Sequence, residues 1–218
     1  MPRIGFLGLG KLGLPVAAAI SRATGSEVIG YDIDPRVEGY VNGAKIPYIE
    51  EGLVGALAES NIRTVGSVQT LVEQADLIFV AVQTPHEPRF EGVTPVPSSP
   101  QDFDYSFLRD GAMELAKALK HTGSSVTVVV ISTVLPGTMR HQILPIFEPL
   151  GERVRFCYNP FFIAMGTTIA DFLDPEFVLI GEGRPGDSSE LVPLYQEIHD
   201  APLSIISIES AELAKVAY

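Results

Sequence analysis

Cysteine and basic residues are scarce in this sequence, and long apolar runs are absent from it. The single cysteine, Cys157, excludes an internal disulfide, and with only four scattered histidines it forms no ligand cluster, so we expect no metal site. Lys and Arg number 15 against 27 Asp and Glu, and the net charge of -12 disfavours nucleic-acid binding. No run approaches the roughly 20 apolar residues that span a bilayer, and the sequence opens without a signal-peptide pattern. We therefore expect a cytoplasmic protein that contacts neither nucleic acid nor membrane.

Apolar runs alternate with helix-length amphipathic segments along most of the chain. The runs are continuously apolar, as in parallel strands that helices cover on both faces. The predicted strands are 3–7, 28–32, 77–82, 126–131, 154–157 and 177–180. The predicted helices are 12–22, 35–42, 51–59, 68–73, 106–119, 139–147 and 208–218. The pattern predicts an α/β fold, a doubly wound and mainly parallel sheet of the Rossmann-like kind.

A glycine-rich segment joins the first predicted strand to the first predicted helix. It reads Gly8-Leu9-Gly10-Lys11-Leu12-Gly13. Between a strand and a helix, G-x-G-x-x-G is the dinucleotide-binding fingerprint. The first glycine permits the tight turn, the second lets the backbone approach a pyrophosphate, and the third lets the helix pack closely on the strand. We expect a dinucleotide to contact this segment at Gly8, Gly10, Lys11, Leu12 and Gly13.

An acidic residue, Asp32, ends the second predicted strand. A carboxylate there accepts hydrogen bonds from the adenosine ribose and repels a 2′-phosphate, so we expect NAD as the cofactor. Arg36 follows closely, where an arginine either lies over the adenine or assists a 2′-phosphate. The alternative is that the glycines form only a tight turn and that Asp32 only caps the helix after it.

A proline-rich stretch, 85–103, interrupts the alternation after the third predicted strand. It begins at the carboxyl edge of the predicted sheet, where open α/β folds bind ligands. A loop of this length is functional or disordered. We weigh an ordered flap over the cofactor, or a contact to another domain, against surface mobility.

Several segments together resemble the nucleotide-sugar dehydrogenases that oxidise UDP-glucose, UDP-N-acetylmannosamine or GDP-mannose. They occur in that family's order across nearly the whole chain. The matching stretches are IGFLGLGKLGLP (4–15), YDIDPRVEGYVNG (31–43), IPYIEEGL (46–53), ADLIFVAVQTP (75–85), STVLPGT (132–138), YNPFFIAMGTTIADFLDPEFVLIG (158–181) and AELAK (211–215). The later segments are the more specific ones, because many dinucleotide-binding proteins share the first two.

The resemblance implies an enzyme that takes a sugar alcohol to a carboxylate in two oxidations with two NAD. Residues 1–206 would be the NAD-binding domain and 207–218 the start of a central helix, with a substrate domain beyond. The chain stops inside a predicted helix without a C-cap signal, so we expect the natural protein to continue and this part alone to be inactive on sugar. The family's members dimerise through the central helix and use a cysteine in the later domain. Cys157 does not match that cysteine, and we interpret it as a core residue.

The resemblance also assigns residues to the cofactor. Thr84 and Pro85 would lie beside NAD, with the Thr84 hydroxyl on the ribose or phosphates. Thr133 would lie near the nicotinamide, where a hydroxyl positions a water or stabilises developing charge. The alternatives are a simple strand-end turn at Thr84 and a cap of the following helix by Thr133.

Substrate contacts are implied further along the chain. Lys215 matches a catalytic lysine whose ammonium stabilises an oxyanion, although a helix lysine commonly faces water. Phe162 and Ile163 match substrate-contact positions and are equally compatible with core packing.

Two departures from the family pattern affect the chemistry. Phe161 and Met165 stand where the family carries glutamates, and neither can act as a general base. The second oxidation is therefore in doubt. The alternatives are a two-electron dehydrogenase that stops at an aldehyde or ketone, and a non-catalytic NAD-binding module.

Overall fold

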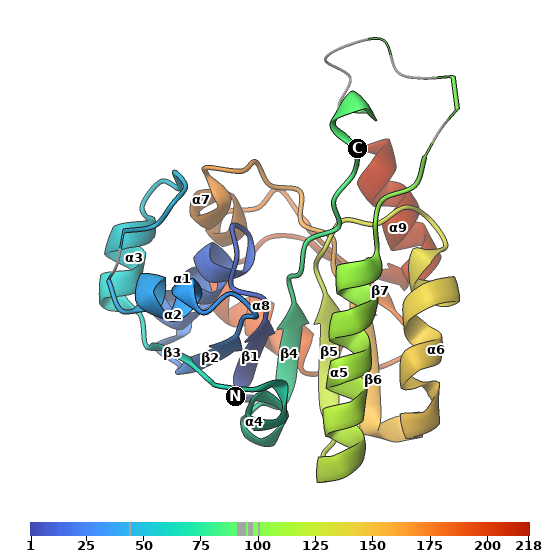
Figure 1. Ribbon diagram of the computed structural model, residues 1–218, viewed down its shortest axis with the longest axis horizontal. Coiled ribbons are helices and arrows are strands. Elements are labelled where there is room, and N and C mark those ends of the chain that lie inside the picture. Colours follow the sequence, from blue (N-terminus) through green and yellow to red (C-terminus); the bar gives the residue numbers. More distant parts are fainter. Residues whose placement is uncertain (44, 91–94, 96–97, 100) are drawn as a thin grey trace.

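A single sheet organises the chain in the computed structural model, which describes residues 1–43, 45–90, 95, 98–99 and 101–218. Within these residues the sheet has eight strands in the order β3-β2-β1-β4-β5-β6-β7-β8 (Figure 1). Neighbouring strands are parallel except β6 and β7, which pair antiparallel. The strands are β1 Ile4–Leu7, β2 Val28–Tyr31, β3 Ile62–Thr64, β4 Leu77–Val80, β5 Val126–Val130, β6 Val154–Tyr158, β7 Val178–Glu182 and β8 Leu203–Ser207. The predicted fold class is confirmed.

Helices cover both faces of the sheet (Figure 1). On one face are α1 (Gly13–Thr24), α2 (Arg36–Val41), α3 (Leu53–Glu59), α7 (Thr168–Leu173) and α8 (Leu191–Ile198). On the other are α4 (Val68–Gln74), α5 (Ser106–Thr122), a π-helical turn η2 (Met139–Ile143), α6 (Leu144–Phe147) and α9 (Ile208–Ala217). Short 3-10 turns η1 (Pro88–Phe90) and η3 (Glu148–Arg153) complete the described elements.

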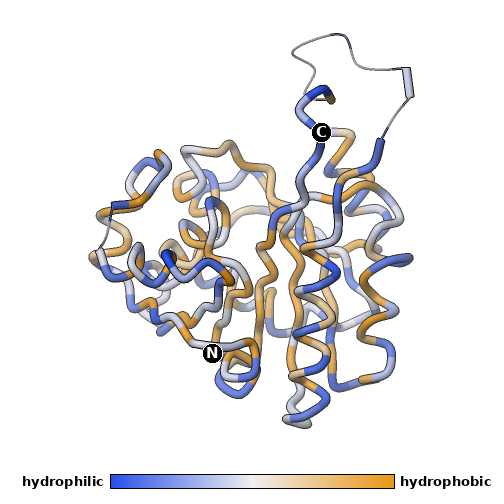
Figure 2. The backbone as a smooth tube through the Cα atoms, viewed as in Figure 1, coloured by the Kyte–Doolittle hydropathy of each residue, from blue (hydrophilic) through white to orange (hydrophobic). Residues whose placement is uncertain are grey.

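Burial on both faces explains why the strands are continuously apolar. In β5, Val128 and Val130 pack toward α5, whereas Val129 packs into the opposite core. All three are fully buried or nearly so. The backbone tube shows the consequence: hydrophobic colour is concentrated along the central strands (Figure 2). A strand in such a sheet has no polar side, and its apolar residues follow one another without alternation.

Besides the 3-10 turns, the sequence-based prediction lacks two strands and two α-helices of the described structure: β3, β8, α7 and α8. β3 and β8 are the two edge strands of the sheet. Neither strand has a fully buried residue, and each contains exposed polar side chains, such as Arg63 in β3 and Ser204 in β8, so no continuous apolar run marks them. The two helices are short, and α8 contains Pro193 within its first turn.

The proline-rich stretch after β4 lies partly outside the described residues, at 91–94, 96–97 and 100. The expectation of a flap over the cofactor falls there. Its two described ends are tied together, since the Asp104 N–H donates to the Pro85 carbonyl at 2.7 Å. The Tyr105 hydroxyl donates to Asp102 at 2.7 Å and accepts from the Leu135 N–H at 3.0 Å. The stretch thus leaves and rejoins the fold at one place.

α9 follows β8 directly and packs against the sheet. Ser207 caps it, because the Ser207 hydroxyl accepts from the Ser210 N–H. A side chain at Gly181 in β7 would come within 2.8 Å of the Ile208 Cα, so the helix approaches the strand closely. The boundary at 206/207 stays a prediction. None of the helices in the described part of the chain has the length and apolar character needed to cross a membrane.

Candidate functional site

The turn between β1 and α1 needs glycine at two positions. Gly8 has φ +96°, and a Cβ there would lie 2.8 Å from the Ala81 carbonyl oxygen. A Cβ on Gly13 would lie 2.1 Å from the Gly8 carbonyl oxygen. Both contacts are with backbone, which cannot give way. The turn therefore brings β1, the following loop and the start of α1 within a distance that any side chain would prevent.

Gly10 is constrained differently from the other two glycines of the turn. A Cβ on Gly10 would meet nothing within 4 Å, and the residue is exposed. The first N–H groups of α1 lie next to it, with the positive end of the helix dipole. Lys11 is exposed here and Leu12 packs partly against the core. This bare, electropositive backbone fits a pyrophosphate that lies against the helix start.

Asp32 faces this turn from the end of β2. Its Oδ2 accepts from the Leu9 N–H at 2.7 Å, and its Oδ1 accepts from the Asp34 N–H at 2.9 Å. The carboxylate is therefore held beside the glycine turn, where the adenosine ribose of a bound dinucleotide would lie. It does not cap α2, because it is Asp34 that accepts from the N–H of Arg36, the first residue of that helix.

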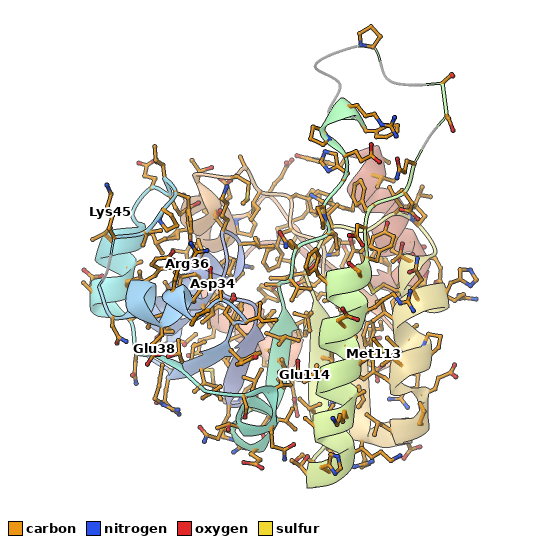
Figure 3. The ribbon with its side chains drawn as sticks, in the orientation of Figure 1. Asp34, Arg36, Glu38, Lys45, Met113 and Glu114 are labelled. Atoms are coloured by element: carbon orange, nitrogen blue, oxygen red, sulfur yellow. The ribbon has the colours of Figure 1, made fainter. Side chains whose placement is uncertain are left out.

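Arg36 is paired with Asp34. The two side chains contact through Arg36 Nε and its terminal nitrogen at 2.7 to 3.0 Å. Figure 3 shows the two residues next to each other where α2 begins. The guanidinium holds the pKa of the Asp34 carboxyl below its ordinary value, chiefly through these hydrogen bonds. The charge of Arg36 is thus engaged by Asp34, and its contact with the cofactor stays a prediction.

The segments after β4 and β5 are joined to each other. The Thr84 hydroxyl donates to the Thr133 carbonyl at 2.7 Å, and the buried Ser132 hydroxyl donates to the Val82 carbonyl at 2.6 Å. Thr84 and Thr133 are half-buried, while Pro85 is exposed. Because β1 lies beside β4 and β4 beside β5, both threonines lie on the sheet edge that carries the glycine turn. The fold brings the two threonines together, and their roles toward the cofactor stay predictions.

Lys215 reaches back from α9 to the segment after β6. Its Nζ donates to the Phe161 carbonyl at 2.7 Å and lies 5.2 Å from the centre of the Phe162 ring. Burial lowers the pKa of the Lys215 ammonium. The side chain is half-buried and points into the fold, unlike an ordinary helix lysine. A cation is therefore fixed at the carboxyl edge of the sheet.

The two positions that depart from the family pattern have different surroundings. The Phe161 ring packs on Phe172, with centroids 5.5 Å apart, whereas Met165 is 61% exposed. Phe162 packs on Phe177 and Tyr218, at 4.9 and 5.0 Å. Neither residue supplies a carboxylate at the position where the family carries a glutamate. Phe161, Phe162 and Ile163 line a cavity of about 150 Å³ whose lining also includes Asp171, Asp174 and Glu176.

Glu212 carries a buried carboxylate, and the residue is absent from the sites predicted from the sequence. It is 0% exposed, and its two oxygens accept from the N–H groups of Gly137 at 2.7 Å and Met139 at 2.8 Å. α9 is thereby tied to the start of the π-helical turn that follows Thr133. The free N–H groups at the start of this turn are therefore satisfied by Glu212, at the helix start where the alternative interpretation placed the Thr133 hydroxyl as a cap. The only signal of Glu212 in the sequence is its place in the AELAK stretch, one turn before Lys215.

Cys157 is a core residue, as predicted. It is 0% exposed, and burial raises the pKa of its thiol. Among the described residues no cluster of His, Cys, Asp or Glu could hold a metal ion. Asn159, two residues on, is buried and satisfied by Leu179 and by the Tyr195 hydroxyl.

Together the sheet order, the glycine turn and the placement of Asp32 define a Rossmann-like dinucleotide-binding domain. Comparison with known proteins names the family. The sequence matches the NAD-binding domain of the UDP-glucose/GDP-mannose dehydrogenase family over residues 2–199, and the chain belongs to that family. The resemblance seen in the motifs is confirmed, as is NAD as the cofactor of this domain.

Individual relatives show the extent of the match. GDP-mannose 6-dehydrogenase of Pseudomonas putida is 30% identical over 222 residues, covering 98% of this chain and 48% of that enzyme. A UDP-glucose dehydrogenase structure from Pyrobaculum islandicum has a TM-score of 0.86 at 27% identity and covers 100% of this chain and 49% of its own. A ternary complex of GDP-mannose dehydrogenase from Pseudomonas aeruginosa has a TM-score of 0.86 at 29% identity, covering 99% and 48%. The chain thus spans about half the length of these relatives.

Proposed function

We propose that this chain is the cofactor-binding part of an enzyme that oxidises a nucleotide sugar with NAD, from alcohol to carboxylate. One observation carries the proposal: Asp32 is held at the glycine turn by the Leu9 N–H at 2.7 Å, beside the unobstructed backbone of Gly10. A pyrophosphate and a ribose need this pairing of bare amides with a carboxylate. NAD, when bound, supplies the acceptor for the hydride that leaves the alcohol carbon.

Different residues at the carboxyl edge of the sheet contact different parts of the cofactor and substrate. The turn from Gly8 to Gly13 and the start of α1 hold the phosphates, and Asp32 holds the adenosine ribose. Thr84 and Thr133, joined by a 2.7 Å hydrogen bond, lie where the nicotinamide end would extend along the edge. Lys215 supplies a fixed positive charge that stabilises an oxyanion as the alcohol loses its hydride. Its hydrogen bond to the Phe161 carbonyl supports this role by fixing the ammonium.

A second candidate is a two-electron oxidation that ends at the aldehyde or ketone. Phe161 and Met165 favour it, because neither offers a base for hydrolysing a covalent intermediate. Phe161 is in addition half-buried and packs against Phe172 of the core. Counting the NADH formed per sugar in the full-length protein separates the two: two NADH support the four-electron reaction and one supports this candidate.

Partners and location follow from the same proposal. The substrate is a nucleotide sugar, as the names of the relatives indicate for those enzymes. A homodimer through the central helix is supported by Leu213 and Val216, which are 58% and 45% exposed on α9. The acidic charge of -12 supports the absence of nucleic-acid binding, and the single cysteine supports a cytoplasmic location.

Calorimetric titration of the 218-residue chain with NAD tests the cofactor site, with Gly10→Ala as the matched variant. Because a Cβ at Gly10 meets nothing within 4 Å, this variant should fold normally. Its methyl group would occupy the surface that the pyrophosphate approaches, so we expect about tenfold weaker NAD binding. Sugar turnover by the isolated chain is not expected. Equal NAD affinity in both proteins, or no NAD binding by either, would contradict the site.

A further inference from the structure

The ion pair between Asp34 and Arg36 sits at the point where dinucleotide-binding folds distinguish NAD from NADP. Asp34 follows Asp32 by two residues, and its N–H donates to the Asp32 Oδ1 at 2.9 Å. Its carboxylate accepts from Arg36 Nε at 2.9 and 3.0 Å, from the terminal nitrogen at 2.7 Å, and from the Arg36 backbone N–H at 3.0 Å. One short segment thus carries a ribose-binding acid, a second acid and an arginine.

An unpaired arginine in this segment would favour the wrong cofactor. Enzymes that use NADP accommodate the 2′-phosphate with an arginine near the end of the second strand. The Arg36 side chain is 76% exposed and long enough to swing about the start of α2. It is held by a carboxylate in the two-pronged geometry that guanidinium also uses for phosphate. A 2′-phosphate would have to displace Asp34 before it could engage the guanidinium.

We propose that Asp34 is a specificity-determining residue that favours NAD over NADP by engaging Arg36. The proposal rests on the cofactor site proposed above. Asp32 repels a 2′-phosphate directly, and Asp34 adds a second effect by removing the cation that would compensate for that repulsion. Arg36 remains available to lie along the adenine, since the adenine carries no charge and does not compete for the guanidinium.

Asp34→Asn is the informative substitution. Asparagine keeps an acceptor oxygen for the Arg36 backbone N–H, so the start of α2 is preserved, while the charge that holds the guanidinium is lost. We expect NADP to bind roughly tenfold more tightly to this variant than to the original chain, because an unpaired guanidinium then lies near the 2′-phosphate. NAD, which lacks that phosphate, should change by no more than about twofold.

Two further variants separate release of Arg36 from simple loss of negative charge. Glu38→Gln removes one carboxylate from the same helix, where Glu38 lies exposed beyond the Asp34 and Arg36 pair (Figure 3). It leaves the Asp34 contact intact, so NADP affinity should stay close to that of the original chain. The double variant Asp34→Asn with Arg36→Ala removes both partners, and the gain in NADP affinity should disappear.

Calorimetric titration of all four proteins with NAD and with NADP, at low and at high salt, measures these outcomes. A gain in Asp34→Asn that salt weakens, and that Arg36→Ala abolishes, supports the proposal. An equal gain in Glu38→Gln overturns it and leaves net charge as the cause. A gain that persists in the double variant, whose net charge equals that of the original chain, also overturns it, because Arg36 would then not be needed for the gain. Failure of the original chain to bind NAD would instead remove the cofactor site itself, which is a distinguishable result.

Discussion

Replacing Glu212 should destabilise the fold far more than replacing any surface acid on the same helix. Its carboxylate is fully buried and accepts hydrogen bonds from the N–H groups of Gly137 and Met139, at the start of the π-helical turn that α9 packs against. No other described side chain is hydrogen-bonded to those two donors. The test variants are Glu212→Gln and Glu212→Ala.

The magnitude follows from the two hydrogen bonds. A hydrogen bond to a charged group contributes about 1.5–3 kcal/mol, and a buried donor without a partner costs about 1–3 kcal/mol. Glutamine keeps one acceptor oxygen and turns an NH2 group toward the other donor, so we expect Glu212→Gln to lose about 2 kcal/mol. Alanine leaves both N–H groups unpaired, and we expect Glu212→Ala to lower the free energy of unfolding by about 4 kcal/mol. The cost of burying the carboxylate itself offsets part of the gain, which keeps these values below the full sum.

Urea unfolding of the 218-residue chain provides the assay, and Glu209→Gln provides the control. Glu209 lies one turn earlier on α9 and pairs with Arg140, but both side chains are exposed, at 40% and 63%. An exposed ion pair contributes about 0–1 kcal/mol. The unfolding midpoint should therefore fall strongly for Glu212→Gln and little for Glu209→Gln, at an unchanged slope. If the two variants were equally stable, the buried carboxylate would not hold α9 in place.

Two other predictions concern stability. Gly13→Ala should lower the free energy of unfolding by about 3 kcal/mol in the same assay, because its Cβ would lie 2.1 Å from the Gly8 carbonyl oxygen. A Gly13→Ala chain as stable as the original would disprove the geometry of the turn. His199 is stacked on Tyr195, its two ring nitrogens are buried without a hydrogen-bond partner among the described residues, and burial lowers its pKa from 6.5. The unfolded chain therefore binds this proton at higher pH than the folded one, and stability should fall as the pH drops below 6.5. His199→Phe keeps the stacked ring and should lose less free energy of unfolding between about pH 7.5 and about pH 5.5, whereas equal losses would assign the acid sensitivity to other groups.

The central part of the fold was predictable because its signals are local. The strands β1, β2, β4, β5 and β6 are buried on both faces, so each appears as a continuous apolar run. The edge strands β3 and β8 do not appear as apolar runs, because one side of each meets solvent and their sequences contain arginine or serine. The antiparallel pairing of β6 with β7 also has no local signal, since strand direction depends on the connection and not on composition.

The candidate site was predictable to the extent that backbone geometry dictates residue type. Gly8 and Gly13 occupy positions that no side chain can fill, and such positions are visible in a sequence. Asp34 and Glu212 are different, because their importance lies in partners brought to them by folding. Arg36 is near Asp34 in sequence, but an ion pair is only one of the geometries that this spacing allows. Gly137 lies 75 residues from Glu212, and no local pattern connects the two.

The reversed direction of β7 and β8 has a consequence for Lys215. β7 and β8 run opposite to the other strands, and Ser207 at the end of β8 is level with Glu182, which pairs with Cys157 near the carboxyl end of β6. α9 therefore begins at the carboxyl edge of the main sheet, beside Gly181, and about 10 Å of helix separates Ile208 from Lys215. The register of the last two strands thus sets the height at which an ammonium group meets the Phe161 carbonyl.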